Sequence, residues 1–224
     1  MAFVQGLTIT IDGPVATVTM ANGENRIGID AVSGLHGAFD TLEGDPSVSS
    51  VVLVGEGRYW STGLDLDEMA ARTDTEQRSF MQSVDLLLGR ILTSPLITVA
   101  ALNGHTYAAG ALLSLAHDYR IMRDDRGFFC LPSVDIGIPF SPGMSALITA
   151  KLPQPVAHDL VVSCRRIGGR EAAAAGVIHR AVEEGEVLQV SKELASAYSG
   201  KDGETLHTVK RRMYADAASM LTVD

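Results

Sequence analysis

Two stretches of sequence decide the fold: GRYWSTGLDL at residues 57–66 and NGHTYAAGALLSLAHD at residues 103–118. Each follows an apolar run that predicts a buried strand, Val51–Val54 before the first and Ile97–Leu102 before the second. Loops of small residues after such strands expose backbone N–H groups, and two of these donors aimed at one point would bind an oxyanion. A helix that starts near Ala109 would add the positive end of its dipole. The alternative is that the small residues only permit tight packing between helix and sheet.

The length and composition predict one large folded domain with at most a modest appendage. The chain has 224 residues, of which 46% are hydrophobic and 20% are charged, and this is enough apolar bulk for a packed core. Its formal net charge of -9 argues against nucleic acid as a partner, because a polyphosphate backbone repels an acidic protein. Cys130 and Cys164 are too few for a disulfide framework or a metal-binding pair, so we expect both to be reduced and no metal site.

The N-terminal sequence MAFVQGLTITIDG has neither a basic start nor a long apolar run, so we predict no signal peptide and expect a cytoplasmic protein. The stretch between Arg90 and Asp118 lacks charged residues and is long enough to span a bilayer. However, Pro95 and the break at residues 103–105 divide it into a strand, a turn and a helix. We therefore predict that the chain has no membrane span.

Apolar periodicity along the chain predicts alternating strands and helices, which is the pattern of the α/β class. Leu7–Asp12 and Val15–Met20 alternate Thr with apolar residues around Gly13-Pro14, as the strands of a hairpin do. The other predicted strands are Val51–Val54, Ile97–Leu102, Tyr119–Met122, Phe128–Cys130 and Val177–Val182. The predicted helices are Asp30–Gly44, Thr75–Leu92, Ala109–His117, Met144–Lys151, Pro155–Cys164, Arg170–Ala175 and Val187–Tyr198, with room for another after Lys201.

Several catalytic and cofactor motifs are absent from the sequence. Gly55–Trp60 begins like a dinucleotide fingerprint but lacks its third glycine, and neither a phosphate loop nor a paired-histidine metal helix occurs. No serine lies in the glycine-flanked elbow of hydrolases. We expect His105 and His117 to be structural, because a lone histidine needs only one partner to be buried in a core. Nucleotide hydrolysis and zinc chemistry thus have no support.

Residues 57–66 and 103–118 resemble, in order and separation, the two signature segments of the enoyl-CoA hydratase/isomerase (crotonase) superfamily. The similarity extends from the N-terminal hairpin to about Val182 and includes GREAAAAGV at residues 169–177. It implies a crotonase-like α/β fold, with a spiral of ββα units at residues 1–182 and a C-terminal helical region at residues 183–224. It also implies an acyl-CoA thioester as ligand, no cofactor beyond the coenzyme A of the substrate, and a homo-oligomer, either a trimer or a hexamer.

The resemblance also implies roles for individual residues. Carried over by position, the oxyanion hole consists of the backbone N–H groups of Leu64 and Ala109. The other substrate-binding positions that the resemblance implies are Ser61, Gly63, Asp65, Leu66, Ala108, Gly110 and Leu112. For Asp65, the sequence favours a role at the start of a helix over a role as a base.

The acid and base positions of the family are occupied by residues that cannot transfer protons. The first of the two glutamates of the hydratases falls at Leu112, so a two-glutamate hydratase is not expected. Residues 108–123 and 131–137 are more similar to the monofunctional Δ3,Δ2-enoyl-CoA isomerases, whose single glutamate falls at Ser133. A serine hydroxyl has no useful proton affinity near neutral pH, and loss of a positioned base typically costs a factor of roughly 100 to 10,000 in rate.

Asp135 is the candidate substitute base. If its segment is extended, the side chain points to the same face as Ser133 and lies within a small shift of the site. The family pattern also has an acid at this position in a structural place. Three functions therefore stay open: an enoyl-CoA isomerase with a substitute base, another acyl-CoA enzyme that uses the oxyanion hole with water or Ser133, and a catalytically silent acyl-CoA binding protein.

Overall fold

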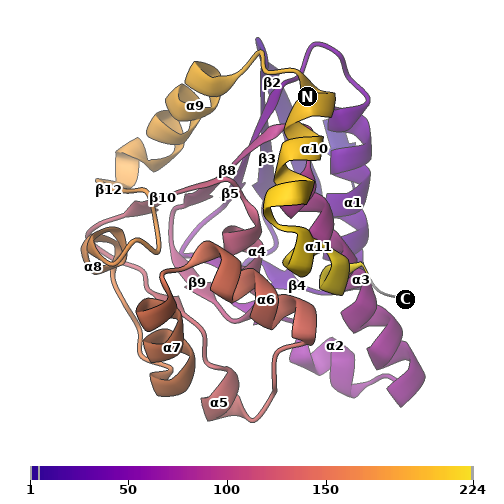
Figure 1. Cartoon of the computed structure of the whole chain (residues 1–224), viewed down its shortest axis with the longest axis vertical. Coiled ribbons are helices and arrows are strands. Elements are labelled where there is room, and N and C mark those ends of the chain that lie inside the picture. Colours follow the sequence, from indigo (N-terminus) through magenta and orange to yellow (C-terminus); the bar gives the residue numbers. More distant parts are fainter. Residues whose placement is uncertain (1, 5, 223–224) are drawn as a thin grey trace.

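The computed structural model describes residues 2–4 and 6–222, and within them the largest sheet has seven strands in the order β1-β2-β3-β5-β8-β10-β12 (Figure 1). The first two pairings, β1 with β2 and β2 with β3, are antiparallel, and every later neighbour is parallel. The strands are β1 Ala2–Val4, β2 Leu7–Asp12, β3 Val15–Met20, β5 Ser50–Gly55, β8 Ile97–Leu102, β10 Tyr119–Arg123 and β12 Arg180–Val182.

Each parallel strand from β3 to β10 is followed by one or two short strands in a second layer and then by a helix. The short strands are β4 Arg26–Ile27, β6 Tyr59–Ser61, β7 Gly63–Leu64, β9 His105–Tyr107 and β11 Phe129–Cys130. Strand β4 pairs with β7, and β9 pairs with both β6 and β11. The helices that follow are α1 Ile29–Glu43, α2 Leu66–Ala70, α3 Asp74–Thr93, α4 Ala109–Ala116, α5 Ser133–Ile136 and α6 Pro142–Lys151. This is the ββα repeat that the resemblance predicts.

The rest of the chain is mainly helical and covers both faces of the large sheet. Its elements are α7 Gln154–Ser163, α8 Gly169–Ala174, the 3-10 turn Glu184–Glu186, α9 Val187–Tyr198, α10 Gly203–Met213 and α11 Ala215–Leu221. Helix α9 packs on β5, β8 and β10 and closes a small apolar cluster on one face. The larger core lies on the other face, where α1, α3, α4, α6 and α11 pack together (Figure 1).

Most of the predicted elements are confirmed. The hairpin, the strand Ile97–Leu102 and the helix Val187–Tyr198 have the predicted bounds, and the other predicted helices differ by one or two residues at their ends. The predicted loop between Gly55 and Gly63 contains β6 and the start of β7, whose partners come from distant segments. The predicted strand Val177–Val182 is shortened to β12, because Val177 and Ile178 form a turn that bonds back to Ala172 O.

The uncharged stretch between Arg90 and Asp118 contains the end of α3, then β8, β9 and α4, which is the predicted division into strand, turn and helix. Among the residues that the structure describes, no helix is long and apolar enough to cross a membrane. Four residues lie outside the described ones. Met1 and Gln5 belong to the N-terminal sequence discussed above, and residues 223–224 belong to the predicted C-terminal helical region.

The extended conformation on which the proximity of Asp135 to Ser133 depends does not occur, because these residues form the short helix α5. The Ser133 hydroxyl donates to Ile138 O, and Gly137 ends the helix in the left-handed conformation with φ 66°. Residues two apart in a helix face different directions, whereas in a strand they share a face. Ser133 is accordingly buried and Asp135 exposed, so the two side chains do not share a face.

A buried and a partly buried lysine fix the C-terminal helices to the core. Lys210 of α10 contacts Asp118 at 2.6 Å and donates to Leu96 O at 2.8 Å. Lys151 of α6 donates to His117 O at 2.9 Å, and its Nζ lies 4.8 Å from the ring centroid of Tyr214, between α10 and α11. Burial is the main cause that lowers the pKa of Lys151 to about 7, so the charged form is unfavourable in the folded protein.

We predict that Lys151→Met makes the protein more stable at neutral and acidic pH. Between pH 7 and 10.5 the unfolded chain keeps a proton that folded Lys151 has lost, so the unfolding free energy rises with pH. The slope from one such proton is at most about 1.4 kcal/mol per pH unit. Urea unfolding from pH 6 to 10 should show a smaller slope in Lys151→Met and a gain of roughly 1–4 kcal/mol at pH 6.

Lys192→Met is the matched control, because Lys192 is partly exposed. Its one ion pair is long, at 3.9 Å, and joins it to the exposed carboxylate of Asp12. The free energy of unfolding of Lys192→Met should change with pH in the same way as that of the unchanged protein. A Lys151→Met protein that is less stable than the unchanged protein at pH 6 would contradict the prediction.

Candidate active site

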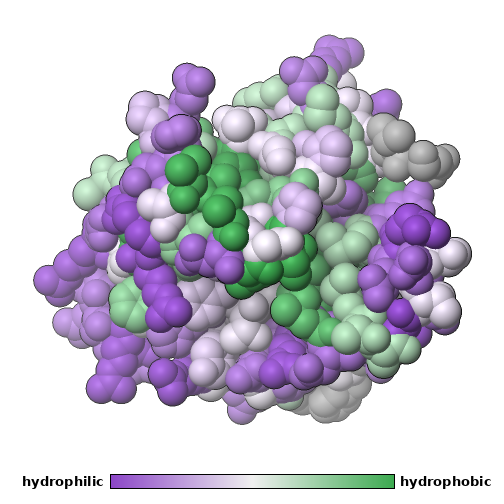
Figure 2. Space-filling view, turned by 90° about the horizontal axis from the view of Figure 1, so that it is seen from below, coloured by the Kyte–Doolittle hydropathy of each residue, from purple (hydrophilic) through white to green (hydrophobic). Residues whose placement is uncertain are grey.

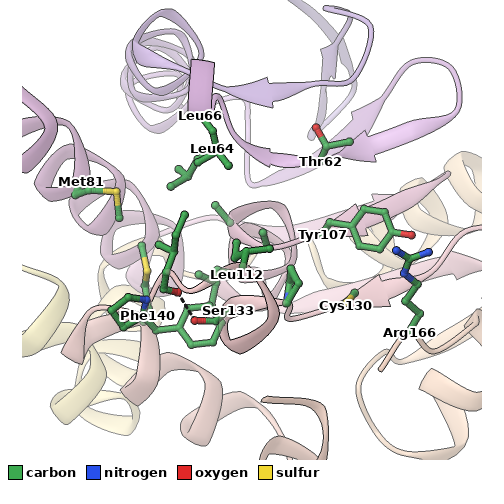
Figure 3. A pocket seen from close by; sticks show the side chains of 17 residues that line it. Thr62, Leu64, Leu66, Met81, Tyr107, Leu112, Cys130, Ser133, Phe140 and Arg166 are labelled. Atoms are coloured by element: carbon green, nitrogen blue, oxygen red, sulfur yellow. Dashed lines mark hydrogen bonds between the residues drawn. The ribbon is translucent and has the colours of Figure 1, made fainter. Parts of the chain in front are cut away.

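A cavity of about 330 Å³ opens where β7, the N-terminus of α4 and α5 meet (Figure 3). Its walls are mostly apolar, and no carboxylate of the described residues 2–4 and 6–222 is among them. The residues that line it are Thr62, Leu64, Leu66, Met81, Tyr107, Ala108, Ala109, Leu112, Cys130, Pro132, Ser133, Ile136, Ile138, Pro139, Phe140, Met144 and Arg166. A cavity of this kind suits a largely apolar ligand that a few polar groups orient.

Apolar residues also gather on the surface on this side of the molecule. Figure 2 views the protein from below Figure 1, the side on which α2 and α5 lie, and shows apolar patches there. Leu66 of α2 and Val134 and Ile136 of α5 are exposed, and two of them, Leu66 and Ile136, also line the cavity. The apolar lining therefore continues to the protein surface.

The two signature segments meet at Gly63, which lies against the first turn of α4. A Cβ atom at Gly63 would lie 2.8 Å from Ala108 Cβ and 3.1 Å from Ala109 N, and Gly63 has φ 96°. A Cβ atom at Gly110 would lie 2.7 Å from Ser61 Cβ. Only glycine permits both approaches. The small residues thus permit tight packing, and the same packing brings two backbone segments together at the cavity.

Two backbone N–H groups on these segments are available at the cavity. Asp65 N–H donates to Ile27 O at 3.1 Å, and consecutive N–H groups of a strand point to opposite edges, so Leu64 N–H points away from β4. Ala109 is the first residue of α4, where an N–H has no partner within the helix. The helix dipole adds partial positive charge at Ala109. Leu64 and Ala109 thus both line the cavity, each with a backbone N–H that its own strand or helix does not use in this way.

Ala108 has a strained backbone that orients the Ala109 N–H. Its φ is 50° and its ψ is -123°, a region that residues other than glycine rarely adopt. Its N–H donates to Cys130 O and its C=O accepts from Leu112 N, both at 3.1 Å. Hydrogen bonds on both sides therefore hold the residue in this conformation. Strain of this kind is typical of functional sites.

The structure brings six of the predicted site residues to the cavity wall. They are Leu64, Leu66, Ala108, Ala109, Leu112 and Ser133. Ser61, Gly63 and Gly110 do not line the cavity; Ser61 Oγ accepts from Gly63 N at 3.2 Å, and all three lie in the close contact between the two segments. Asp65 is the N-cap of α2 and accepts from Glu68 N at 3.1 Å, as a helix-start residue does. Asp135 is exposed and outside the cavity wall.

The positions of the family glutamates offer no base. Leu112 is buried and apolar, and the Ser133 hydroxyl is already donated to Ile138 O. Asp85 of α3 accepts from Ser141 at 3.0 Å, next to the lining residue Phe140, and burial raises the pKa of its carboxyl, but it does not line the cavity. Among the described residues, no group of three or more His, Cys, Asp or Glu side chains is arranged to hold a metal ion.

Sequence reasoning missed the residues that form the two ends of the cavity. Met81 comes from α3, Phe140 from the loop before α6 and Met144 from α6, and no local pattern distinguishes them from ordinary core residues. Tyr107 and Arg166 come from β9 and from the loop after α7. A signal for Tyr107 was present, because it lies within the segment 103–118, two residues before Ala109. Cys130 lines the cavity as a thiol, and burial raises its pKa to about 11.

We predict that Ala108→Gly stabilises the protein, which is the opposite of what this substitution does in a helix. Glycine relieves the strained conformation but increases the entropy of the unfolded chain. The relief is the larger effect, and the free energy of unfolding should rise by about 1 kcal/mol. The control is Ala150→Gly at an exposed position of α6, where we expect a loss of about 1 kcal/mol. Both effects are measured by urea unfolding. Equal losses in the two variants would show that Ala108 is not strained.

Comparison with known proteins assigns the family. The sequence profile described as enoyl-CoA hydratase/isomerase matches residues 10–223. The chain is similar to enoyl-CoA delta isomerase 3 of Arabidopsis thaliana, with 29% identity over 88% of this chain and 87% of the relative. It is also similar to carnitinyl-CoA dehydratase of Salmonella typhimurium, with 27% identity over 85% of this chain and 73% of the relative. Human mitochondrial delta3-delta2-enoyl-CoA isomerase has the same fold, with a TM-score of 0.88, 25% identity and coverage of 96% of this chain and 85% of that one. The chain therefore belongs to the enoyl-CoA hydratase/isomerase (crotonase) family.

Proposed function

We propose that the chain binds an acyl-CoA thioester with the thioester oxygen between the N–H groups of Leu64 and Ala109. The observation that supports this proposal is that Leu64 and Ala109 line one apolar cavity, where Gly63 packs closely against the first turn of α4. Negative charge develops on this oxygen when a thioester forms an enolate. Removal of one such donor from an enzyme generally costs about 3–4 kcal/mol of transition-state stabilisation, so the pair would be the largest catalytic contribution.

The apolar lining supports the same function in two ways. It gives a hydrocarbon chain a place to bind, and it excludes water, which strengthens the electrostatic attraction between the N–H groups and the enolate oxygen. Coenzyme A is part of the substrate in this proposal, and no further cofactor is required.

The reaction that we propose is of the enoyl-CoA isomerase or hydratase type, with reduced or altered activity. Ser133 stands where the isomerases have their glutamate, and Leu112 where the hydratases have their first one. For Asp135 to act as the substitute base, α5 would have to rearrange, since this side chain is exposed. The alternative is a catalytically silent or functionally diverged acyl-CoA binding protein. It is favoured by the absence of a carboxylate from the cavity wall among the described residues.

We further propose a cytoplasmic homo-oligomer, either a trimer or a hexamer, with a ββα core at residues 1–182 and a helical region at residues 183–224. Support for assembly comes from α10 and α11, which expose Val209, Met213 and Met220. Large apolar side chains on one helical region favour contact with another copy of the chain.

The first prediction from this function is that a saturated acyl-CoA binds more tightly than free CoA. Calorimetry should show a preference of about 10-fold or more, because only the thioester has an oxygen for the two donors. Ala109→Pro removes one donor at the first helical position, where proline is tolerated, and should reduce the preference. Ala109→Gly keeps the N–H and should retain it. Thermal unfolding checks that both variants are folded. Equal binding of acyl-CoA and free CoA by the unchanged protein would contradict the proposed oxyanion hole.

The second prediction is that Ser133→Glu raises isomerase turnover on a 3-enoyl-CoA by roughly 100-fold to 10,000-fold, since a carboxylate at this position moves a proton from C2 to C4. Ser133→Gln is the control, because it has the same size and no proton affinity. Asp135→Asn should change turnover less than about 3-fold, given the exposure of Asp135.

The competing assignments give different results in the same assay. Measurable turnover that falls about 100-fold in Asp135→Asn would identify Asp135 as the base. Tight acyl-CoA binding without turnover in any of these variants would favour the silent binding protein.

A further inference from the structure

The two ends of the cavity differ in chemistry. Figure 3 shows Met81 and Phe140 at one end and Tyr107, Cys130 and Arg166 at the other, with Leu64 and Leu112 between them. The first end is formed by apolar side chains. The second end contains the guanidinium of Arg166, which is the one charged side chain in the cavity wall among the described residues. The cavity therefore has an apolar end and a cationic end.

Arg166 has no anionic partner within the part of the chain that the structure describes. Its neighbour Arg165 contacts Asp159 at 2.7 Å and Glu171 at 2.5 Å, whereas no carboxylate of residues 2–4 and 6–222 lies within 4.0 Å of the Arg166 guanidinium. The guanidinium carbon of Arg166 instead lies 5.5 Å from the ring centroid of Tyr107. Stacking on an aromatic ring holds a guanidinium in place and leaves its N–H groups free to bind an anion.

Tyr107 and its neighbours add to the attraction for an anion. Tyr107 Oη lies 3.2 Å from His105 Nδ1, and the two rings are stacked. Burial, and then the charges of Arg58, Arg166 and Arg123, lower the pKa of His105, so the imidazole is neutral at pH 7. The tautomer of His105 with its proton on Nδ1 donates to Tyr107 Oη and leaves the Tyr107 O–H free, whereas the other tautomer accepts from that O–H.

The position of this end relative to the oxyanion donors indicates which anion binds. Tyr107 precedes Ala109 by two residues, and the lining residue Thr62 precedes Leu64 by two residues. A thioester bound between Leu64 and Ala109 therefore lies in the same cavity as Tyr107 and Arg166. In coenzyme A a long, uncharged pantetheine arm separates the thioester from the phosphates. An anionic group close to the thioester must accordingly belong to the acyl part.

We propose that Arg166 and Tyr107 bind a carboxylate carried by the acyl group, so that the substrate class is a short acyl-CoA with a second, free carboxylate. The proposal rests on the binding of a thioester between Leu64 and Ala109. It assigns to Arg166 the role of a specificity-determining residue. The carboxylate of Asp135 does not take this place, because it is outside the cavity wall and not within 4.0 Å of the Arg166 guanidinium.

Calorimetry with matched ligands tests the proposal. Glutaryl-CoA and pentanoyl-CoA have acyl chains of equal length that differ in the terminal carboxylate, and the corresponding pantetheine thioesters lack the phosphates. The unchanged protein should bind the glutaryl member of each pair about 10-fold or more tightly than the pentanoyl member. Arg166→Gln should bring both ratios to about one. Arg165→Gln is the matched control and should keep both ratios, since Arg165 is paired at the surface.

Each other outcome overturns the proposal. If Arg166→Gln weakens both CoA thioesters alike and leaves both pantetheine thioesters unchanged, Arg166 contacts a phosphate of coenzyme A. If the unchanged protein binds both CoA thioesters equally, the cationic end is merely solvated, while the proposed function stands. If neither CoA thioester binds better than free CoA, the proposed function itself is wrong.

Discussion

The close approach of Gly63 to the peptide between Ala108 and Ala109 is the contact on which the site depends. It places the N–H groups of two segments beside one cavity, although these segments are far apart in the sequence. The contact requires a residue without a side chain at Gly63 and at Gly110, and a strained backbone at Ala108. A side chain at either glycine would force α4 away from the second layer of strands, and the Ala109 N–H would then move out of register with Leu64.

Two asparagine side chains, of which Asn25 is buried and Asn103 partly buried, hold the loops that form this contact. Asn103 accepts from Gly55 N and donates to Gly57 O, both at 3.0 Å, so one amide joins the ends of two neighbouring strands. Asn25 donates to Tyr59 O at 2.8 Å. Donors that stabilise an oxyanion must be oriented before the reaction, because their reorientation would cost as much as they provide. The amides thus make two loops rigid enough to act as a site.

Local sequence patterns predicted the elements whose stability is local. The hairpin and α9 have strong periodicity, and aspartate is a favoured N-cap residue. The predictions for these elements and for Asp65 are confirmed. Helix α5 was missed because it depends on a contact of Ser133 with Ile138 and on the left-handed Gly137, neither of which periodicity reveals. The small strands β6 and β7 have too few residues for a pattern and form by pairing with distant strands. Of the site, the sequence predicted the two segments that meet at the cavity, whereas the cationic end requires the fold to bring Arg166 to Tyr107.

The missing glutamates and the unpaired arginine have one electrostatic explanation under the proposed substrate class. Leu112 and Ser133 line the same cavity as Arg166, so a glutamate at either position would share an apolar space with the carboxylate of the acyl group. Two unit charges about 6 Å apart repel by about 3 kcal/mol at an effective dielectric constant of about 20, which would cancel the attraction from one guanidinium. Leucine and serine remove this repulsion. The same substitutions leave the cavity without a proton acceptor of its own, so proton transfer has to proceed through water or through the substrate. Under the proposed substrate class, the cavity therefore lacks the family's carboxylate base and binds a carboxylate ligand without repulsion from such a base.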